Sequence, residues 1–391
     1  MSSPLTPNSN HADVIVIGSG VLGAFHAYFA AQKGYKTLLL ERNALPTDAS
    51  TRNFGMVVQS IVETEGEWAE YAHATREIYQ AIQQECDISV NIPGSLYLAS
   101  TEAERVVLEE FAHLYASVYN CSYLTAGEIR YRYPFAQADY CQGALHFTND
   151  FTIEPRRLLK QWLPYFTERE QVQYVPYTNV VSVESSGQQC VVKDARGTTF
   201  TAEQVFVCSG AEYRTLFPDF FRTSGLRICK LQMMQTVALP LHTLPLSILS
   251  GLSILRYPAF NSTPSYEKLR EQPVDADLRE YGIHLLFKQA MDGSVIIGDS
   301  HEYSDFQDAS VSEEYTNCRI NDAILRYGQR MLTLPSWEIE QMWNGYYLLH
   351  PQRAVYTETI NGNIHITTGI AGKGMSTGPG FSRQHINTVL A

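Results

Sequence analysis

The sequence has few cysteines, no long apolar run and fewer basic than acidic residues. Its seven cysteines are scattered and form no C-x-x-C pair. The histidines His11, His26 and His73 also lack the spacing of metal ligands. We therefore expect reduced, mostly buried thiols, no disulfide and no metal site.

Membrane-spanning and secretory segments are missing as well. The apolar runs 14–17 and 38–40 are far shorter than the roughly 20 residues that cross a bilayer. The polar start of the chain has no positive stretch followed by an apolar core. These absences predict a soluble, cytoplasmic protein.

Basic residues are in deficit, since 29 Lys and Arg stand against 41 Asp and Glu, for a formal charge of −12. This surplus of acid argues against a general affinity for nucleic acid or an anionic membrane. Any anionic ligand would need a local basic pocket. Nothing in the sequence indicates an oligomeric state.

The chain does contain a strand, helix and strand pattern near its N-terminus, followed by many short strands. Residues 13–17 and 35–40 are predicted strands that flank a helix over 21–34. With 391 residues, 45% of them hydrophobic, the chain exceeds the size of one core, so we expect two interleaved domains. The predicted fold class is α/β plus α+β, a Rossmann-like domain interleaved with an antiparallel-sheet domain. Later predicted elements include a capped helix at 101–119, a helix at 313–332 and strands at 227–238, 253–257, 283–289, 294–298 and 337–347.

The glycine pattern G-x-G-x-x-G lies directly after the first predicted strand. Gly18, Gly20 and Gly23 let the backbone approach a pyrophosphate at the N-terminus of the following helix. Glu41 ends the second strand, where a carboxylate binds the ribose hydroxyls of an adenosine. A tight turn beside a surface glutamate is the alternative, but the order of strand, glycines, helix, strand and acid favours a dinucleotide site.

Two further segments favour FAD over NAD. Arg42 and the polar segment 50–56 (STRNFGM) suit a cofactor that extends beyond the pyrophosphate, although an ordinary surface loop is the alternative for this segment. A glycine-rich turn at 369–374 places N–H groups near the flavin N1/O2 edge. We expect non-covalent FAD, because no cysteine lies near this turn. The predicted cofactor-binding residues are Gly18, Gly20, Val21, Leu22, Gly23, Glu41, Arg42, Ser50, Thr51, Arg52, Asn53, Gly55, Met56, Val180, Ser209, Gly210, Gly372, Lys373, Gly374 and Met375.

With these landmarks and the segment 205–210 (VFVCSG), the chain resembles the D-amino-acid oxidase, glycine oxidase and sarcosine oxidase superfamily over nearly its whole length. Within it, the segments 50–56, 226–234, 256–260, 281–285 and 298–303 resemble a subfamily associated with phosphonate breakdown. The types of the predicted elements divide the chain into an FAD-binding domain of residues 11–85, 148–222 and 336–391 and a substrate-binding domain of residues 86–147 and 223–335.

The resemblance also implies a reaction. An FAD enzyme of this kind would oxidise the C–N bond of 2-aminoethylphosphonate or its N-methyl form by hydride transfer to flavin N5. The imine would hydrolyse to an aldehyde, and O2 or another acceptor would take the electrons. One departure is the segment 346–353 (YYLLHPQR), where relatives keep a Gly-Leu-Arg-Pro type segment, which weakens the case for a carboxylate-binding arginine there. Glycine, sarcosine or another amino acid is the alternative substrate, and a non-catalytic flavoprotein is the alternative of another class.

Hydride transfer needs a free amine lone pair and an oriented C–H bond. We therefore expect an aromatic wall, acceptors for the amine protons and donors for an anionic head. The segment 299–301 (DSH) is not taken as a hydrolytic set, because neighbours on a strand point to opposite faces and no G-x-S-x-G elbow is present. The predicted catalytic residues are Lys230, Tyr257, His284 and His301. The predicted substrate-binding residues are Gln232, Tyr257, His284, Arg353 and Lys373, although purely structural roles are the alternative for several of them.

Overall fold

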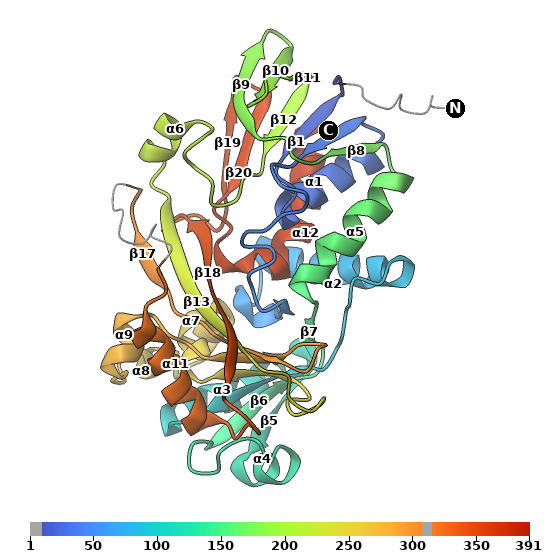
Figure 1. The fold of residues 1–391 in the computed structure, drawn as a ribbon. Coiled ribbons are helices and arrows are strands. Elements are labelled where there is room, and N and C mark those ends of the chain that lie inside the picture. Colours follow the sequence, from blue (N-terminus) through green and yellow to red (C-terminus); the bar gives the residue numbers. More distant parts are fainter. Residues whose placement is uncertain (1–9, 307–314) are drawn as a thin grey trace.

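The computed structural model describes residues 10–306 and 315–391, and these form two stacked halves (Figure 1). The upper half is built on a six-stranded sheet of order β19-β20-β12-β1-β2-β8. All neighbouring strands in it are parallel except β19 and β20. The strands are β1 (Val14–Ile17), β2 (Thr37–Leu40), β8 (Val172–Val175), β12 (Gln204–Val207), β19 (Tyr356–Ile360) and β20 (Ile364–Thr368).

Both faces of this sheet are covered, which explains why strands such as VIVI are apolar throughout. Val14 and Val16 face a core shared with helices, whereas Ile15 and Ile17 face a core shared with a three-stranded antiparallel sheet. The helices on the first face are α1 (Val21–Gln32), α2 (Glu67–Glu85), α5 (Pro155–Arg169) and α12 (Gly374–Val389). The small sheet contains β9 (Val180–Ser186), β10 (Gln189–Asp194) and β11 (Thr199–Ala202).

The lower half is built on a nine-stranded sheet of order β17-β13-β16-β15-β14-β4-β6-β5, with β18 paired to β13. Its pairs are antiparallel except for β4 with β14. The strands are β4 (Ser95–Ala99), β5 (Cys121–Thr125), β6 (Gly143–Phe147), β13 (Arg227–Thr236), β14 (Ser247–Ser250), β15 (Leu286–Gln289), β16 (Val295–Gly298), β17 (Glu302–Ser304) and β18 (Ile339–Leu349).

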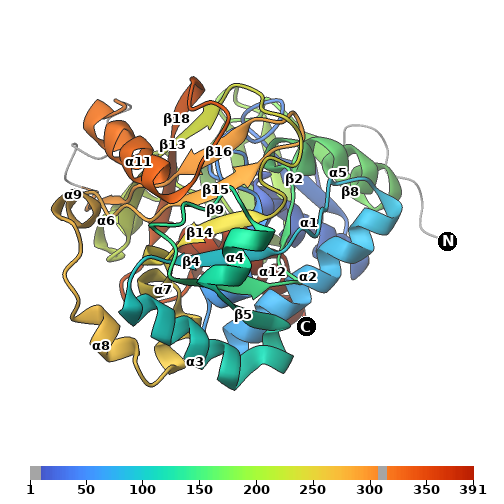
Figure 2. The same ribbon diagram turned by 90° about the horizontal axis from the view of Figure 1, so that it is seen from below.

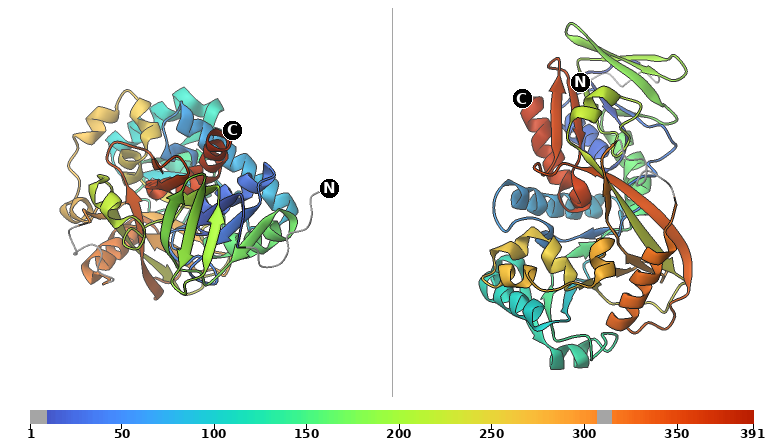
Figure 3. Two further views of the ribbon diagram at one scale, coloured as in Figure 1. Left: turned by 90° about the horizontal axis from the view of Figure 1, so that it is seen from above. Right: turned by 90° about the vertical axis from the view of Figure 1, so that its left-hand side faces the viewer.

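Helices lie on both faces of the larger sheet, which Figure 2 shows from below. One hydrophobic core of this sheet contains residues of the helices at 126–132 and 318–331, and the other contains residues of the helices at 102–119 and 266–270. The long strands β13 and β18 run between the two halves along one side of the molecule (Figure 3). A short pair of strands, β3 (Met56–Val57) and β7 (Phe151–Thr152), stands apart from both large sheets. The other α-helices among the described residues are α3 (Glu102–Tyr119), α4 (Ala126–Arg132), α6 (Pro218–Thr223), α7 (Leu252–Arg256), α8 (Tyr266–Arg270), α9 (Ala276–Glu280) and α11 (Cys318–Met331).

The predicted fold class is confirmed, since a Rossmann-like parallel sheet and a largely antiparallel sheet are interleaved along the chain. The domain boundaries stay a proposal. Strand β18 lies within 336–391, the last range assigned to the FAD-binding domain, yet it pairs with β13 of the larger sheet over its whole length. That pairing would move the start of this last range to a position after β18.

One predicted strand is wrong. Residues 253–257 lie in helix α7 and its C-cap, not in a strand. Five residues of mixed polarity do not show a period, and the burial of Ser253 and Ile254 on one side of the turn decides the conformation. The predicted helix at 313–332 corresponds to α11, and its positions 313 and 314 lie outside the described residues. Among the residues that the structure describes, no helix is long and apolar enough to cross a membrane.

Helix α3 begins with the predicted capping box. The hydroxyl of Thr101 accepts from the N–H of Glu104, and the Glu104 carboxylate accepts from the N–H of Thr101. We expect Thr101→Ala to lower the free energy of unfolding by about 1–2 kcal/mol, because it leaves a helix N–H without a partner. Urea unfolding would measure this loss. Thr101→Ser keeps the acceptor oxygen and should retain most of the stability, so equal losses for both variants would contradict the capping role.

Candidate functional site

The turn between β1 and α1 is kept free of side chains. Gly18 has φ +94°, and a Cβ there would lie 2.5 Å from the Cys208 carbonyl oxygen. A Cβ on Gly23 would lie 1.8 Å from the carbonyl oxygen of Gly18, and one on Gly20 would lie 3.0 Å from Oγ of Ser50. With no Cβ at these three positions, the backbone of the turn can come close to an anion at the N-terminus of α1.

Two cavities meet at this turn. The first, here called the glycine cavity, is lined by Gly18, Glu41, Arg42, Val180 and Ser209 among others. The second, here called the central cavity, extends from the turn to the larger sheet. Both are lined by Gly20, Ala49, Ser50, Cys208, Gly210 and Ala211.

Glu41 is buried at the wall of the glycine cavity. One of its carboxylate oxygens accepts from the N–H and the hydroxyl of Ser19, each at 2.9 Å, and the other accepts from the N–H of Asn43 at 3.0 Å. Arg42 beside it forms ion pairs with Asp48 and Glu212. The carboxylate is thus fixed at the end of β2, where it can accept from ribose hydroxyls.

The segment 50–56 passes between the two cavities. The Ser50 hydroxyl accepts from the N–H of Val21 at 2.9 Å, which closes the N-terminus of α1. Arg52 donates to the carbonyls of Thr47 and Asn344. Val21 and Leu22, together with Ser50, Arg52, Asn53, Gly55 and Met56 of this segment, line the central cavity. Thr51 lines a separate hollow at the surface.

The C-terminal turn reaches the central cavity from the other side. Gly372, Gly374 and Met375 line it where helix α12 begins, so the positive end of a sixteen-residue helix lies at the cavity wall. Lys373 does not line the cavity, and its ammonium lies 4.7 Å from the centre of the Trp68 ring. Burial lowers the pKa of Lys373, while Glu63 opposes this shift.

These features fit FAD. The side-chain-free turn suits a pyrophosphate, the buried Glu41 suits a ribose, and the glycine cavity and central cavity adjoin as an extended cofactor requires. The central cavity also has apolar walls for a flat ring system. These walls include Phe54, Met56, Val58, Leu231, Met233, Leu286 and Leu348.

The polar end of the central cavity contains Arg256, which the sequence analysis did not select. It ends α7 and is half-buried. Its Nη2 donates to the hydroxyls of Tyr303 at 3.2 Å and Tyr347 at 3.3 Å. Among residues 10–306 and 315–391, no carboxylate lies within 4.0 Å of its guanidinium. The cavity therefore holds a cation whose neighbours are two phenols.

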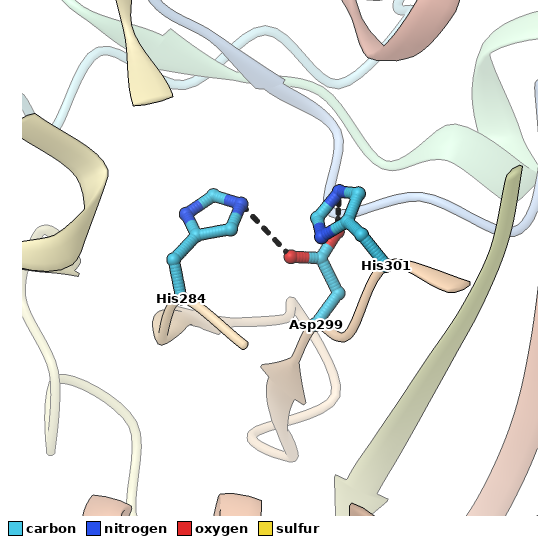
Figure 4. A group of neighbouring side chains, drawn as sticks. All are labelled: His284, Asp299 and His301. Atoms are coloured by element: carbon cyan, nitrogen blue, oxygen red, sulfur yellow. Dashed lines mark ion pairs between the residues drawn. The ribbon is translucent and has the colours of Figure 1, made fainter. Parts of the chain in front are cut away.

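His284, Asp299 and His301 form a second polar group in the same cavity, here called the Asp299 triad (Figure 4). Nε2 of His284 lies 3.1 Å from Oδ1 of Asp299, and Nε2 of His301 lies 3.7 Å from Oδ2. The β15 and β16 ladder continues to this point, since the backbones of His284 and Asp299 exchange hydrogen bonds. The side chains from two strand ends are brought together by this pairing.

Burial governs the protonation of the triad. It lowers the pKa of His284 and of His301, so both imidazoles are neutral near pH 7. Burial alone would raise the pKa of Asp299, but His301, His284 and Arg256 around it hold that pKa below its ordinary value. The triad thus carries an ionised carboxylate between two neutral rings.

Lys230 and Gln232 lie on one face of β13, as the strand period predicts, but this face is not the cavity face. The ammonium of Lys230 donates to the carbonyl of Tyr315 at 2.6 Å, and Gln232 is fully buried. Leu231 and Met233 line the cavity instead. The alternation was predicted correctly, but the face was not, because the sequence does not indicate on which side α11 and residues 315–317 pack.

Arg353 and Gly23 also lie outside the cavity lining. Arg353 is exposed, with its guanidinium 5.1 Å from the Tyr356 ring centre and 4.0 Å from Glu358. This position gives no geometric support to its predicted role in substrate binding. Gly23 packs against Gly18 and shapes the turn without lining a cavity. Tyr257 is buried and lines the central cavity as a wall, with its ring 5.9 Å from that of His284.

The residues that sequence reasoning missed are Arg256, Asp299, Tyr303 and Tyr347. Arg256 was missed because 253–257 was predicted as a strand, and Asp299 because it was considered only as part of a hydrolytic set. The spacing of Asp299 and His301, two residues apart, was the available signal that both point to one side.

Comparisons with known proteins agree with this geometry. The family model described as "FAD dependent oxidoreductase" (DAO) matches residues 13–385. Glycine oxidase of Geobacillus kaustophilus (strain HTA426) is 27% identical over 207 residues, 51% of this chain and 54% of that protein. This alignment therefore spans about half the length of the curated relative. Glycine oxidase of Bacillus licheniformis is 28% identical over 52% of this chain and 56% of its own length.

The fold is similar over a much longer stretch. The crystal structure of the Geobacillus kaustophilus glycine oxidase superposes with a TM-score of 0.77 at 17% identity, covering 98% of this chain and 95% of that one. These percentages of identity show a common fold and not a common substrate. The match of the family model over residues 13–385, together with the glycine turn and the adjoining cavities, shows that the chain belongs to the DAO family of FAD-dependent oxidoreductases and that FAD is its cofactor.

Proposed function

We propose that this protein oxidises the C–N bond of a small amine that carries an anionic head, and that the substrate is an aminoalkylphosphonate such as 2-aminoethylphosphonate or its N-methyl form. The observation that carries the proposal is Arg256, a cation in the central cavity with no carboxylate within 4.0 Å of its guanidinium among the described residues. FAD, when bound, accepts the hydride from the carbon next to nitrogen. Water then hydrolyses the imine, which would give phosphonoacetaldehyde.

The neighbours of Arg256 support a phosphonate head. The guanidinium donates to the phenol oxygens of Tyr303 and Tyr347. Tyr347 also lines the central cavity, so its O–H can turn toward a ligand oxygen. The several N–H donors of the guanidinium and the phenol of Tyr347 together match the three oxygens of a phosphonate better than the two of a carboxylate. The chain has a formal charge of −12, so a local cation of this kind is what an anionic substrate requires.

Glycine, sarcosine or another amino acid is the second candidate substrate. The curated relatives named glycine oxidase favour it, and an arginine also binds a carboxylate well. The two candidates differ in the anionic head that Arg256 would bind and in the number of carbons between that head and the amine nitrogen. A substrate comparison therefore separates them.

Turnover of purified protein with 2-aminoethylphosphonate, its N-methyl form, glycine and sarcosine tests the proposal. Hydrogen peroxide and an artificial electron acceptor should be followed side by side, because O2 and another acceptor are both open. We expect kcat/KM for at least one phosphonate to exceed that for glycine by more than about tenfold, the effect of roughly one additional charge-assisted hydrogen bond. Equal turnover of glycine or sarcosine would contradict the phosphonate assignment.

We also propose that FAD is held without a covalent bond. Cys208 lines both cavities, but burial raises the pKa of its thiol, which keeps it protonated and unreactive near pH 7.

The same proposal includes the domain division, the predicted cofactor contacts and the roles of His284, His301 and Tyr257.

A further inference from the structure

His301 presents a lone pair to the central cavity. Its Nδ1 lies 3.0 Å from the carbonyl oxygen of Gly282, and a carbonyl can only accept, so Nδ1 carries the proton of the neutral ring. Nε2 is then an acceptor, and it faces Oδ2 of Asp299 at 3.7 Å. Nε2 of His301 and Oδ2 of Asp299 are therefore two hydrogen-bond acceptors that face each other with no hydrogen between them.

The carboxylate of Asp299 is poorly satisfied. Oδ1 is buried and accepts no well-aligned hydrogen bond from the described residues, although Nε2 of His284 lies 3.1 Å away. Nδ1 of His284 is within 3.1 Å of the Ser253 hydroxyl, which fixes the orientation of that ring. A buried ionised carboxylate with unfilled acceptor positions is costly unless a cationic donor binds it.

We propose that the Asp299 triad binds the ammonium group of the substrate and that His301 removes its proton, an assignment that rests on the proposed amine oxidation. Nε2 of His301 and Oδ2 of Asp299 are close enough for a single ammonium to donate to both. Arg256 lines the same cavity and has the opposite charge. The cavity thus offers a cationic group for the anionic head and an anionic group for the amine.

The proton transfer balances within the triad and the substrate. One N–H bond of the ammonium breaks, its electron pair stays on nitrogen as the lone pair that hydride loss requires, and the proton bonds to Nε2 of His301. The imidazolium then lies between Asp299 and the Gly282 carbonyl, which both stabilise its charge. After burial, the positive charge of Arg256 is one cause of the lowered pKa of His301. An anionic head bound to Arg256 would offset that positive charge and so raise the pKa of His301.

Other titratable and charged groups also face the triad and contribute to its pH dependence. They come from α7, β13, β17 and β18 and are Arg256, Tyr257, Cys229, Tyr303 and Tyr347. Burial raises the pKa values of the thiol and the phenols, so these groups stay neutral below pH 9. A pH-dependent rate between pH 6 and pH 9 should therefore report on the substrate amine and the triad.

Anaerobic reduction of the flavin by 2-aminoethylphosphonate, measured from pH 6 to pH 9 in Asp299→Asn and His301→Gln, tests the assignment. At pH 7 we expect the reduction rate to fall by about 10²–10³-fold, the usual effect of losing a general base. The rate should then recover by nearly tenfold for each pH unit, since unprotonated amine arrives from solution below its pKa of about 10. A loss caused by misfolding would show no such recovery.

Binding of ethylphosphonate, which has the head but no amine, provides the second readout through the flavin spectrum. We expect both variants to retain FAD and to bind ethylphosphonate within about threefold of wild type, because the head binds at Arg256. Asp219→Asn and His73→Gln change exposed residues and serve as matched controls.

Three results would overturn the assignment: unchanged reduction rates, loss of ethylphosphonate binding equal to the loss of rate, or a stoichiometric divalent metal in the purified protein. The metal result counts because the three ligand atoms of the triad lie within 4.8 Å of one another and such a set can hold a cation. If no amine reduces the wild-type flavin, the proposed function fails as a whole, and this outcome is distinguishable from failure of the triad assignment alone.

Discussion

Replacing Arg256 with leucine should lower kcat/KM for an anionic amine on the order of 100-fold, because removing one partner of a desolvated charge pair costs about 3 kcal/mol. Arg256 is the charge-bearing group that we assign to the head of the substrate, and its side chain is already oriented by Tyr303 and Tyr347. Steady-state kinetics with 2-aminoethylphosphonate would measure the loss.

Two matched variants sharpen this test. Arg256→Lys keeps the charge but lacks the planar fork of donors, so we expect an intermediate loss of about tenfold. Arg353→Leu removes an exposed guanidinium, with 52% of its side chain accessible, and should change kcat/KM by less than about twofold. An equal loss in Arg353→Leu, or no loss in Arg256→Leu, would contradict the assignment of the head to Arg256.

Replacing Gly23 with alanine should abolish stable FAD binding. The new Cβ would lie 1.8 Å from the backbone oxygen of Gly18, which cannot rotate away, so β1 and α1 must move apart. Overpacking of this kind costs about 1–3 kcal/mol. The backbone that moves is the turn that would bind the pyrophosphate. We expect protein purified without bound flavin, with affinity for added FAD reduced by at least about tenfold.

The absorbance ratio of flavin to protein after dialysis measures this effect, and titration with FAD gives the affinity. Gly127→Ala in α4 is the matched control, because the nearest atom to its new Cβ is 3.9 Å away and alanine favours a helix by up to about 1 kcal/mol. Retention of FAD in Gly23→Ala at the level of Gly127→Ala would contradict the role of the glycine turn.

The cofactor half of the protein could be predicted from the sequence because its structure depends on residues that are close together in the chain. A buried parallel strand, a turn that tolerates no Cβ and a helix N-terminus follow one another between residues 14 and 32. The capping box of Thr101 and Glu104 is local in the same way. Each of these features depends on residues close together in the chain, so no knowledge of tertiary packing was needed.

The substrate end could be predicted only in part, because it depends on contacts between distant segments. His284 and His301 were selected, but Asp299 between them becomes significant only when β15 and β16 pair. Arg256 faces the cavity because residues 252–256 are helical, which packing around Ser253 and Ile254 decides. Which face of β13 lines the cavity, and so whether Lys230 or Leu231 does, likewise depends on tertiary packing.

Anaerobic mixing of the purified yellow protein with amines tests whether it oxidises amines that carry an anionic head. We predict that 2-aminoethylphosphonate or its N-methyl form will bleach the flavin absorbance at about 450 nm, whereas propylamine at the same concentration will not. This result would show amine oxidation that depends on an anionic head. Failure of every amine to bleach the flavin, or equal bleaching by propylamine, would contradict the account.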